Sequence, residues 1–156
     1  MNILLIEDDK DKSKKIENFL KTILDANITE RRSLKSGLKE LVLAGGSYDF
    51  ILMDMSMPNF DISMDEPEGG THENFAGRDL LAQMKLREID SKVLIITQYD
   101  TFGTSYNKLS LDELKKQLKD EFSPIYQDTI YYNSAQEDWK NELKKKIELI
   151  IGIKND

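Results

Sequence analysis

Short apolar runs alternate along the chain with longer amphipathic stretches. Runs of this kind, bounded by polar residues, are typical of strands that are buried on both faces of a parallel sheet. Five strands are predicted, at residues 3–6, 28–33, 50–53, 93–96 and 125–132. The first, third and fourth runs are the most continuous, so these strands should be buried on both faces. The second is polar enough to lie near an edge of the sheet.

The stretches between and after the strands suit amphipathic helices. Apolar residues recur there at helical spacing, for example Leu80, Leu81 and Met84, so that one side of each helix can cover the sheet. Alternation of strands and helices favours right-handed crossovers and a parallel sheet with helices on both faces. The predicted fold class is therefore α/β: a doubly wound, five-stranded parallel sheet with the flavodoxin-like strand order 2-1-3-4-5.

The chain is expected to form a single domain over residues 1–156. Two segments depart from its regular alternation of strands and helices. Residues 59–75 are polar and rich in Asp and Glu, with a proline and two adjacent glycines, and they predict a long acidic loop. Residues 99–123 predict an enlarged fourth crossover. It contains an amphipathic helix that Ser110 or Asp112 could cap.

Composition and charge disfavour several classes of function. The 156 residues are 39% hydrophobic and 33% charged, as in a soluble globular protein, with a formal net charge of -7 and a pI near 4.9. This charge disfavours nucleic acid and anionic membranes as partners, because binding to both depends on basic patches. The absence of cysteine excludes disulfides and thiolate chemistry. No segment suits a signal peptide or a membrane span, so a cytoplasmic location is expected.

Carboxylate side chains follow two strands that should be neighbours in the sheet. Glu7 and Asp8 come after the first strand, and Asp54 comes after the third. In open α/β sheets the carboxyl ends of the strands form the ligand crevice. Three carboxylates in one small region repel each other unless a cation is present, and such oxygen ligands suit Mg2+. A competing interpretation is that the acidic residues 7–9 only charge and cap the amino end of the first helix.

Four short motifs occur in a characteristic order along the chain. They are ILLIEDD at residues 3–9, FILMDMSMP at 50–58, Ala76-Gly77 at the start of the third helix, and IIT at 95–97. Together with the strand and helix alternation, this set resembles the receiver domain of two-component response regulators. The resemblance covers nearly the whole chain. It implies the flavodoxin-like receiver fold and a role in phosphorelay signal transduction rather than in enzyme catalysis.

The resemblance implies a role for each residue at the predicted ligand edge. Asp54 would be the phosphoacceptor, since a carboxylate can act as a nucleophile toward phosphorus. Glu7, Asp8 and the backbone carbonyl of Ser56 would hold Mg2+ together with the Asp54 carboxylate. Thr97, at the end of the fourth strand, would donate its hydroxyl to a phosphoryl oxygen. The phosphoryl group would come from a histidine kinase or phosphotransfer protein, and the signal would pass to a separate output protein.

One element of the receiver pattern is missing. Receivers carry a lysine just after the fifth strand, and its ammonium pairs with the phosphoryl group. Here Ser134 occupies that position if Tyr131 is the family's switch aromatic, and a register slip of one residue would put Asn133 there. No lysine is apparent in the predicted pocket, so the charge-assisted contact would be lost.

Three functional hypotheses follow from these observations. The first is a stand-alone receiver that is phosphorylated on Asp54 with Mg2+ and acts through a partner protein. The second is a pseudo-receiver that serves as a phosphorylation-independent protein-interaction module. The third is a magnesium-dependent enzyme of a neighbouring α/β class that acts on phosphate esters. This third function would need a second acid–base residue, or a lysine, close to Asp54.

Overall fold

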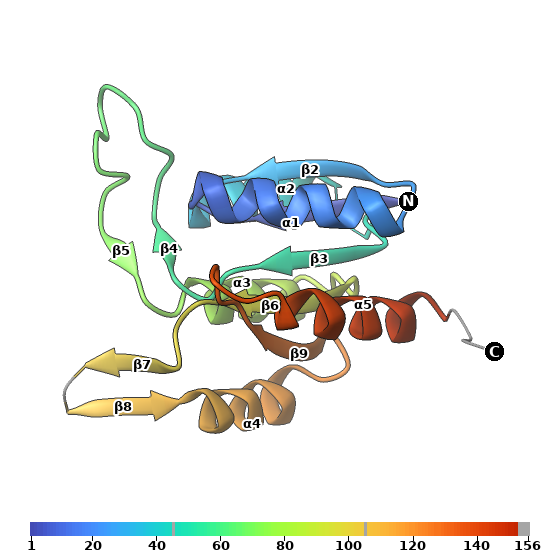
Figure 1. Ribbon diagram of the computed structural model, residues 1–156. Coiled ribbons are helices and arrows are strands. Elements are labelled where there is room, and N and C mark those ends of the chain that lie inside the picture. Colours follow the sequence, from blue (N-terminus) through green and yellow to red (C-terminus); the bar gives the residue numbers. More distant parts are fainter. Residues whose placement is uncertain (45, 105, 153–156) are drawn as a thin grey trace.

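A parallel sheet of five strands organises the chain (Figure 1). The computed structural model describes all residues except 45, 105 and 153–156, which the predicted domain also covers. The strand order is β2-β1-β3-β6-β9, which is 2-1-3-4-5 when these five strands are counted along the chain, so the predicted fold class is confirmed. The strands are Asn2–Ile6 (β1), Asn27–Arg31 (β2), Phe50–Met53 (β3), Lys92–Thr97 (β6) and Tyr126–Tyr131 (β9).

Burial explains which strands form the middle of the sheet. Every residue of β3 is buried, and in β1 only Asn2 is exposed. Each of these strands pairs on both sides, β1 with β2 and β3, and β3 with β1 and β6. Strand β2 has no fully buried residue and forms one edge of the sheet, as its polar sequence predicted.

Helices cover both faces of the sheet. On one face, α1 and α5 pack against Ile3 and Leu5 of β1; on the other, α2, α3 and α4 pack around Leu4 and Ile6 of the same strand. Successive side chains of a strand point to opposite faces, which is why one short strand serves two cores. The helices are Lys10–Ile23 (α1), Leu34–Ala44 (α2), Ala76–Leu86 (α3), Leu111–Phe122 (α4) and Asp138–Ile151 (α5). Within the described residues, no helix is both long and apolar enough to cross a membrane.

Residues 57–75, which we call the first insertion, form a hairpin that stands away from the sheet (Figure 1). Its stem is the antiparallel pair β4 (Met57–Pro58) and β5 (His72–Glu73). Toward its tip, Ile62 and Met64 are fully open to solvent or nearly so, with 75% and 101% of their surface exposed. The insertion therefore adds an apolar as well as an acidic surface to the fold.

A second hairpin lies between β6 and α4. Its strands β7 (Thr101–Thr104) and β8 (Asn107–Ser110) pair antiparallel, and we call residues 99–110 the second insertion. Helix α4 begins directly after it. Of the two predicted caps, Ser110 is the N-cap, because its Oγ accepts a hydrogen bond from the Glu113 amide at 3.2 Å and the Glu113 carboxylate accepts one from the Ser110 amide.

Candidate functional site

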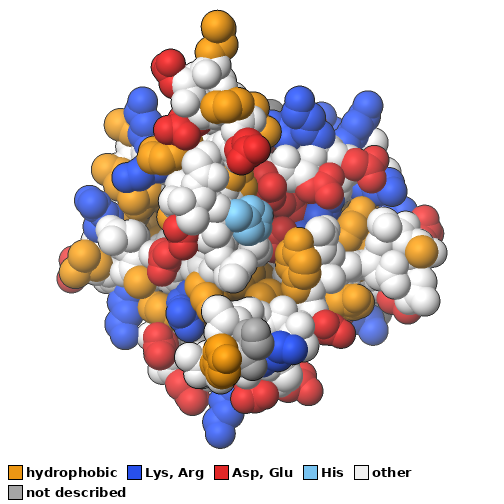
Figure 2. Space-filling view, turned by 90° about the vertical axis from the view of Figure 1, so that its left-hand side faces the viewer, with side chains coloured by type: hydrophobic (Ala, Val, Ile, Leu, Met, Phe, Trp, Pro, Cys, Tyr) orange, Lys and Arg blue, Asp and Glu red, His pale blue; other side chains and the backbone are white. Residues whose placement is uncertain are grey.

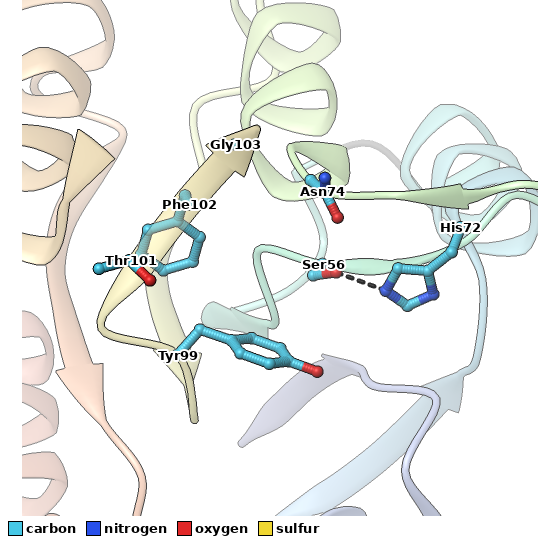
Figure 3. A pocket seen from close by; sticks show the side chains of 7 residues that line it. All are labelled: Ser56, His72, Asn74, Tyr99, Thr101, Phe102 and Gly103. Atoms are coloured by element: carbon cyan, nitrogen blue, oxygen red, sulfur yellow. Dashed lines mark hydrogen bonds between the residues drawn. The ribbon is translucent and has the colours of Figure 1, made fainter. Parts of the chain in front are cut away.

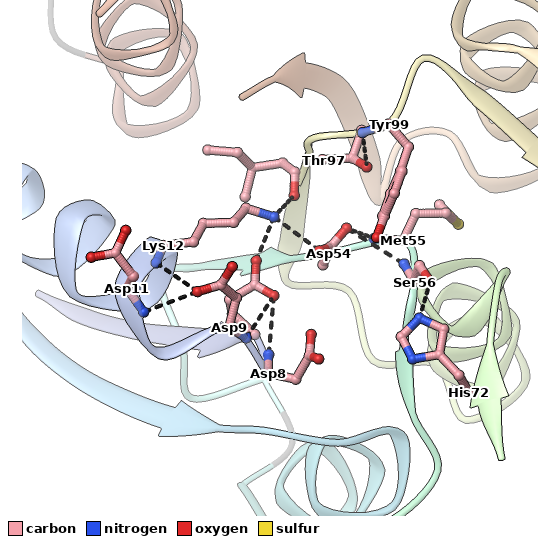
Figure 4. Close-up of polar contacts among 12 residues, drawn as sticks. Asp8, Asp9, Asp11, Lys12, Asp54, Met55, Ser56, His72, Thr97 and Tyr99 are labelled. Carbon is pink, nitrogen blue, oxygen red and sulfur yellow. Dashed lines mark hydrogen bonds and ion pairs between the residues drawn. The ribbon is translucent and has the colours of Figure 1, made fainter. Parts of the chain in front are cut away.

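The acidic residues that follow β1 and β3 meet at the carboxyl end of the sheet (Figure 4). The backbone amide of Asp54 donates to the carbonyl of Ile6 at 3.1 Å, which continues the pairing of the two strands beyond their last paired residues. One carboxylate oxygen from each of Glu7, Asp8 and Asp54 lies within 4.8 Å of the other two. We call these three residues the carboxylate cluster. Glu7 and Asp54 are buried, whereas Asp8 is partly exposed.

A lysine from α1 enters the carboxylate cluster (Figure 4). The ammonium of Lys12 donates to Asp54 Oδ2 at 2.9 Å and to the backbone carbonyl of Ile96 at 2.9 Å. It also contacts a carboxyl oxygen of Glu7. Only 1% of the Lys12 side chain is exposed, so its charge is balanced within the protein rather than by water.

The expectation that no lysine lies in the pocket is therefore wrong. That expectation was based on the residues after the last strand, whereas Lys12 lies in the first turn of α1. The sequence did contain a signal, because Lys12, Ile16 and Leu20 follow each other at intervals of four residues. All three are buried on the face of α1 that packs on the sheet. A lysine on the apolar face of a helix calls for a buried anionic partner.

Burial and mutual charge shift the ionisation of this group. Burial, followed by the charge of Asp54, raises the pKa of Glu7 to about 9, although the Lys12 ammonium opposes the shift. Burial by itself would lower the pKa of Lys12, but the charges of Asp54 and Glu7 outweigh it and the net shift is upward. The lysine therefore remains a cation at neutral pH, and the cluster retains a proton that Glu7 would lose in water.

The competing interpretation of residues 7–9 as helix caps applies to one of them. Asp9 is the N-cap of α1, since its Oδ1 accepts from the amides of Asp11 at 3.0 Å and Lys12 at 3.1 Å. Glu7 turns inward instead, and its second carboxyl oxygen accepts the amide of Asp8 at 3.0 Å. The cap fixes the first turn of the helix and so positions Lys12 above the end of the sheet.

The loop after β3 wraps around the Asp54 carboxylate. Asp54 Oδ1 accepts from the amide of Met55 at 2.7 Å and from that of Ser56 at 3.4 Å. The start of α3 lies against this loop, where the Gly77 amide donates to the Met55 carbonyl at 2.9 Å. A Cβ at Gly77 would lie 2.7 Å from the Asp54 carbonyl oxygen, so this close approach requires glycine. Ser56, a sequence-predicted site residue, thus lies directly beside Asp54.

Thr97 lies at the end of β6 and is completely buried. Its hydroxyl oxygen accepts a hydrogen bond from the amide of Tyr99 at 3.2 Å, rather than bonding to the carboxylate cluster. Its carbonyl accepts the amide of Tyr132 at 2.7 Å and so ties the end of β6 to the end of β9. The structure therefore brings Glu7, Asp8 and Asp54 into one cluster and leaves the Thr97 hydroxyl in a separate local contact.

The end of β9 borders the same space as Lys12. Tyr131 is 42% exposed, whereas Tyr132 is buried. Asn133 uses its side-chain oxygen in a turn, accepting the amide of Ala135 at 2.9 Å. A cavity of about 400 Å³ lies between β9 and α1, and its lining residues are Asp9, Asp11, Lys12, Gln98, Tyr131, Tyr132, Asn133 and Ser134. Both positions considered for the receiver lysine thus share a cavity with Lys12.

The two insertions form a cleft beside Ser56, two residues after Asp54 (Figure 3). The rings of Phe75 and Phe102 lie 6.5 Å apart and join the insertions. The imidazole of His72 and the hydroxyl of Ser56 are hydrogen-bonded, and Figure 2 shows this histidine next to a group of acidic side chains. The cleft, which we call the insertion cleft, has a volume of about 170 Å³ and is lined by Ser56, His72, Asn74, Tyr99, Thr101, Phe102 and Gly103.

Comparison with curated proteins finds relatives that match the chain over most of its length. The uncharacterized protein y4jR of Sinorhizobium fredii is 30% identical over 147 residues, which cover 92% of this chain and 95% of that protein. The Detocs response regulatory protein DtcB of Enterobacter cloacae is 29% identical over 152 residues, covering 94% and 98% of the two chains. No protein-family model matches the sequence.

Solved structures with the same fold include receiver domains and response regulators. The receiver domain of the Francisella response regulator 1452 aligns with a TM-score of 0.64 at 19% identity, covering 97% of this chain and 96% of that one. The response regulator TrrA from Thermotoga maritima, solved in complex with Mg2+-BeF, aligns with a TM-score of 0.58 at 16% identity, covering 93% and 97%. At such low identity these two structures establish the fold, and the function must be argued from the site.

Proposed function

We propose that the chain is a receiver-type signalling protein that accepts a phosphoryl group on Asp54 in the presence of Mg2+, a proposal supported by its receiver fold and by its 29% identity to a response regulatory protein. The donor is a histidine kinase or a phosphotransfer protein. The phosphorylated chain then acts on a separate output protein. Receiver domains are signalling domains, so the chemistry is confined to transfer onto this chain itself and needs no turnover of a further substrate.

The observation that carries the proposal is the carboxylate cluster. Asp54 ends a fully buried central strand, and one oxygen from each of Glu7 and Asp8 lies within 4.8 Å of an Asp54 oxygen. A carboxylate oxygen of Asp54 attacks the phosphorus of a phosphohistidine and forms a P–O bond while the P–N bond breaks. The electron pair of the broken bond remains on the imidazole nitrogen of the donor.

The residues of the cluster fit a divalent metal. Their donors are hard carboxylate oxygens, and a cation is already accommodated among them, because the Lys12 ammonium contacts both Glu7 and Asp54. Glu7, Asp8, Asp54 and the backbone carbonyl of Ser56 are the residues that would hold Mg2+. Bound there, the metal would supply positive charge that offsets the charge on the transferred phosphoryl oxygens.

Thr97 is proposed to donate its hydroxyl to a phosphoryl oxygen on Asp54. This hydroxyl accepts from the Tyr99 amide, and among the described residues no hydrogen bond uses its own proton. Tyr99 begins the second insertion, so a shift of Thr97 toward Asp54 would move that insertion. The phosphorylated protein would then differ from the unphosphorylated one in the position of the second insertion, and we propose that the output protein recognises this difference.

Mass spectrometry after incubation with acetyl phosphate tests the proposal. Wild-type protein with Mg2+ should gain the mass of one phosphoryl group, and EDTA should abolish the gain. Asp54→Asn should remain unmodified, while Asp128→Asn, a change at a partly buried aspartate of β9 far from the cluster in sequence, should react like wild type. Absence of any adduct on the wild type, together with no spectral response to beryllofluoride, would reject phosphoryl transfer.

A second candidate function is supported by two features of the chain. Lys12 already neutralises part of the carboxylate cluster, and the first insertion presents the exposed side chains of Ile62 and Met64. Both features suit a pseudo-receiver that binds a protein partner without phosphorylation. Partner binding that is unchanged in Asp54→Asn would favour this module over the phosphorylated receiver.

A further inference from the structure

We propose that Lys12 is a tethered cation with two alternating partners. In the absence of metal its ammonium holds Glu7 and Asp54, and it competes with Mg2+ for these two carboxyl groups. When Asp54 is phosphorylated, the same ammonium pairs with the phosphoryl group. The inference rests on the proposed function, because it assigns a positioning and charge-pairing role to a residue of the same pocket.

The proposed competition rests on the contacts of Lys12. Its ammonium lies 2.9 Å from Asp54 Oδ2 and in contact with Glu7, so it engages two of the three carboxyl groups in the cluster. A metal ion that binds these oxygens must take them from the ammonium, since a second cation so close would be repelled in a buried site. The chain therefore carries an internal competitor for its own metal.

The position of the ammonium also suits a phosphoryl group on Asp54. Lys12 already donates to Asp54 Oδ2, so a group attached to that carboxylate lies within reach of the same side chain. An ammonium has three donors on a flexible four-carbon stem. The Ile96 carbonyl, at 2.9 Å, keeps the ammonium at the end of β6 when the carboxylates are given up.

The cavity between β9 and α1 explains why a lysine from α1 can serve here. Lys12, Asn133 and Ser134 all line this cavity, which is about 400 Å³ in volume. The side of the cavity formed by the end of β9 offers only neutral side chains, and Asn133 is occupied in a turn. The ammonium therefore enters the pocket from the opposite side, from the first turn of a helix that Asp9 caps.

A purely structural lysine makes a different prediction from a tethered cation. If Lys12 only neutralised buried acids, its removal would disturb the pocket and weaken every ligand that binds there. A tethered cation instead weakens the binding of Mg2+ and strengthens the binding of a phosphoryl group. Removing it should strengthen binding of Mg2+ and weaken binding of beryllofluoride, which imitates the phosphoryl group, and opposite signs cannot come from general damage.

Titration of metal-free protein with Mg2+ and then with beryllofluoride tests the proposal. Binding is followed by calorimetry and by the fluorescence of Trp139, whose ring packs 5.0 Å from that of Tyr132, which in turn lies 5.6 Å from the Lys12 ammonium. Lys12→Gln should bind Mg2+ about tenfold more tightly than wild type, and at saturating Mg2+ it should bind beryllofluoride about tenfold more weakly. An unchanged or weaker Mg2+ affinity, or an unchanged beryllofluoride affinity, overturns the inference.

Two further variants control the experiment. Lys14→Gln removes the same charge from an exposed position on α1, and it should leave both affinities within about twofold of wild type. If Lys12→Gln does not fold, Lys12→Arg keeps a cation among the carboxyl groups, and it should bind Mg2+ no more tightly than wild type. Tighter Mg2+ binding by the arginine variant contradicts the competition.

The wild-type protein separates this inference from the proposed function. If wild type gains neither a phosphoryl group from acetyl phosphate nor a spectral change with beryllofluoride, phosphoryl transfer to Asp54 is rejected and the role of Lys12 in it falls as well. If wild type shows both responses while Lys12→Gln equals it in both affinities, only the inference about Lys12 is rejected.

Discussion

The carboxylate cluster and the insertion cleft both adjoin the loop after β3, but they are built in opposite ways. In the cluster, Glu7 and Asp54 are buried and both contact the buried ammonium of Lys12. In the cleft, most of the polar side chains come from the two insertions and are open to solvent, with His72 exposed and Tyr99 44% exposed. The cluster should therefore govern both stability and chemistry, whereas the cleft can vary without unfolding the protein.

The largest effect is expected from removing the buried cation. Lys12→Met leaves the Asp54 carboxylate buried without a cation, and breaking a buried pair in this way costs about 3 kcal/mol in the free energy of unfolding. Urea denaturation in EDTA at neutral pH measures the loss. The matched change Lys14→Met, on the exposed side of the same helix, should cost less than about 0.5 kcal/mol. An equal decrease in the free energy of unfolding of the two variants would mean that the contacts of Lys12 in the cluster do not stabilise the fold.

The next effect is a pH dependence that originates in Glu7. Its pKa is about 9 in the folded protein and 4.5 in the absence of the fold, so the folded state holds an extra proton between these pH values. The contribution of Glu7 to stability is complete below about pH 4.5 and is lost as the pH rises toward 9. Within this window, each rise of one pH unit lowers the contribution of Glu7 to the free energy of unfolding by about 1.4 kcal/mol.

Between pH 6 and pH 8 in EDTA, the free energy of unfolding of the wild type should therefore fall by roughly 2 to 3 kcal/mol more than that of Glu7→Gln, which has no titrating group at this position. Urea denaturation of both proteins at several pH values gives the two profiles. Parallel profiles would show that burial does not hold the proton on Glu7.

A smaller loss is expected at the boundary between cluster and cleft. Gly77→Ala would place a Cβ 2.7 Å from the Asp54 carbonyl oxygen and 3.1 Å from the Met55 Cα, and backbone atoms cannot yield as side chains do. Overpacking of this kind costs about 2 kcal/mol. Gly46→Ala is the control, because its Cβ would meet only the Asp90 carboxylate at an ordinary 3.5 Å. Thermal denaturation should therefore show a lower Tm for Gly77→Ala only, and an equal Tm in both variants would disprove the close approach.

The smallest effect is expected in the insertion cleft. His72→Ala removes a hydrogen bond to Ser56 from an exposed side chain, and it should lower the free energy of unfolding by less than about 1 kcal/mol. A loss above about 2 kcal/mol, measured by the same urea denaturation, would show that the cleft is part of the folding core and would remove the distinction between the two regions.

The sequence determined the fold and the position of the acids. Short, near-continuous apolar runs are typical of strands that are covered on both faces, and β1, β3 and β6 were predicted within one residue of their bounds. The carboxyl ends of adjacent parallel strands must share one edge, so the meeting of Glu7, Asp8 and Asp54 followed from the strand order.

Only the tertiary structure decided which cation those acids meet. A strand pattern records which side chains end at an edge of the sheet, but it does not record how a helix that crosses that edge is rotated. The rotation of α1 is set by its packing through Ile16 and Leu20 and by its Asp9 cap, and it turns Lys12 inward. The contact between Lys12 and Asp54 joins residues 42 positions apart in the chain, so it depends on packing, which local sequence periodicity does not specify.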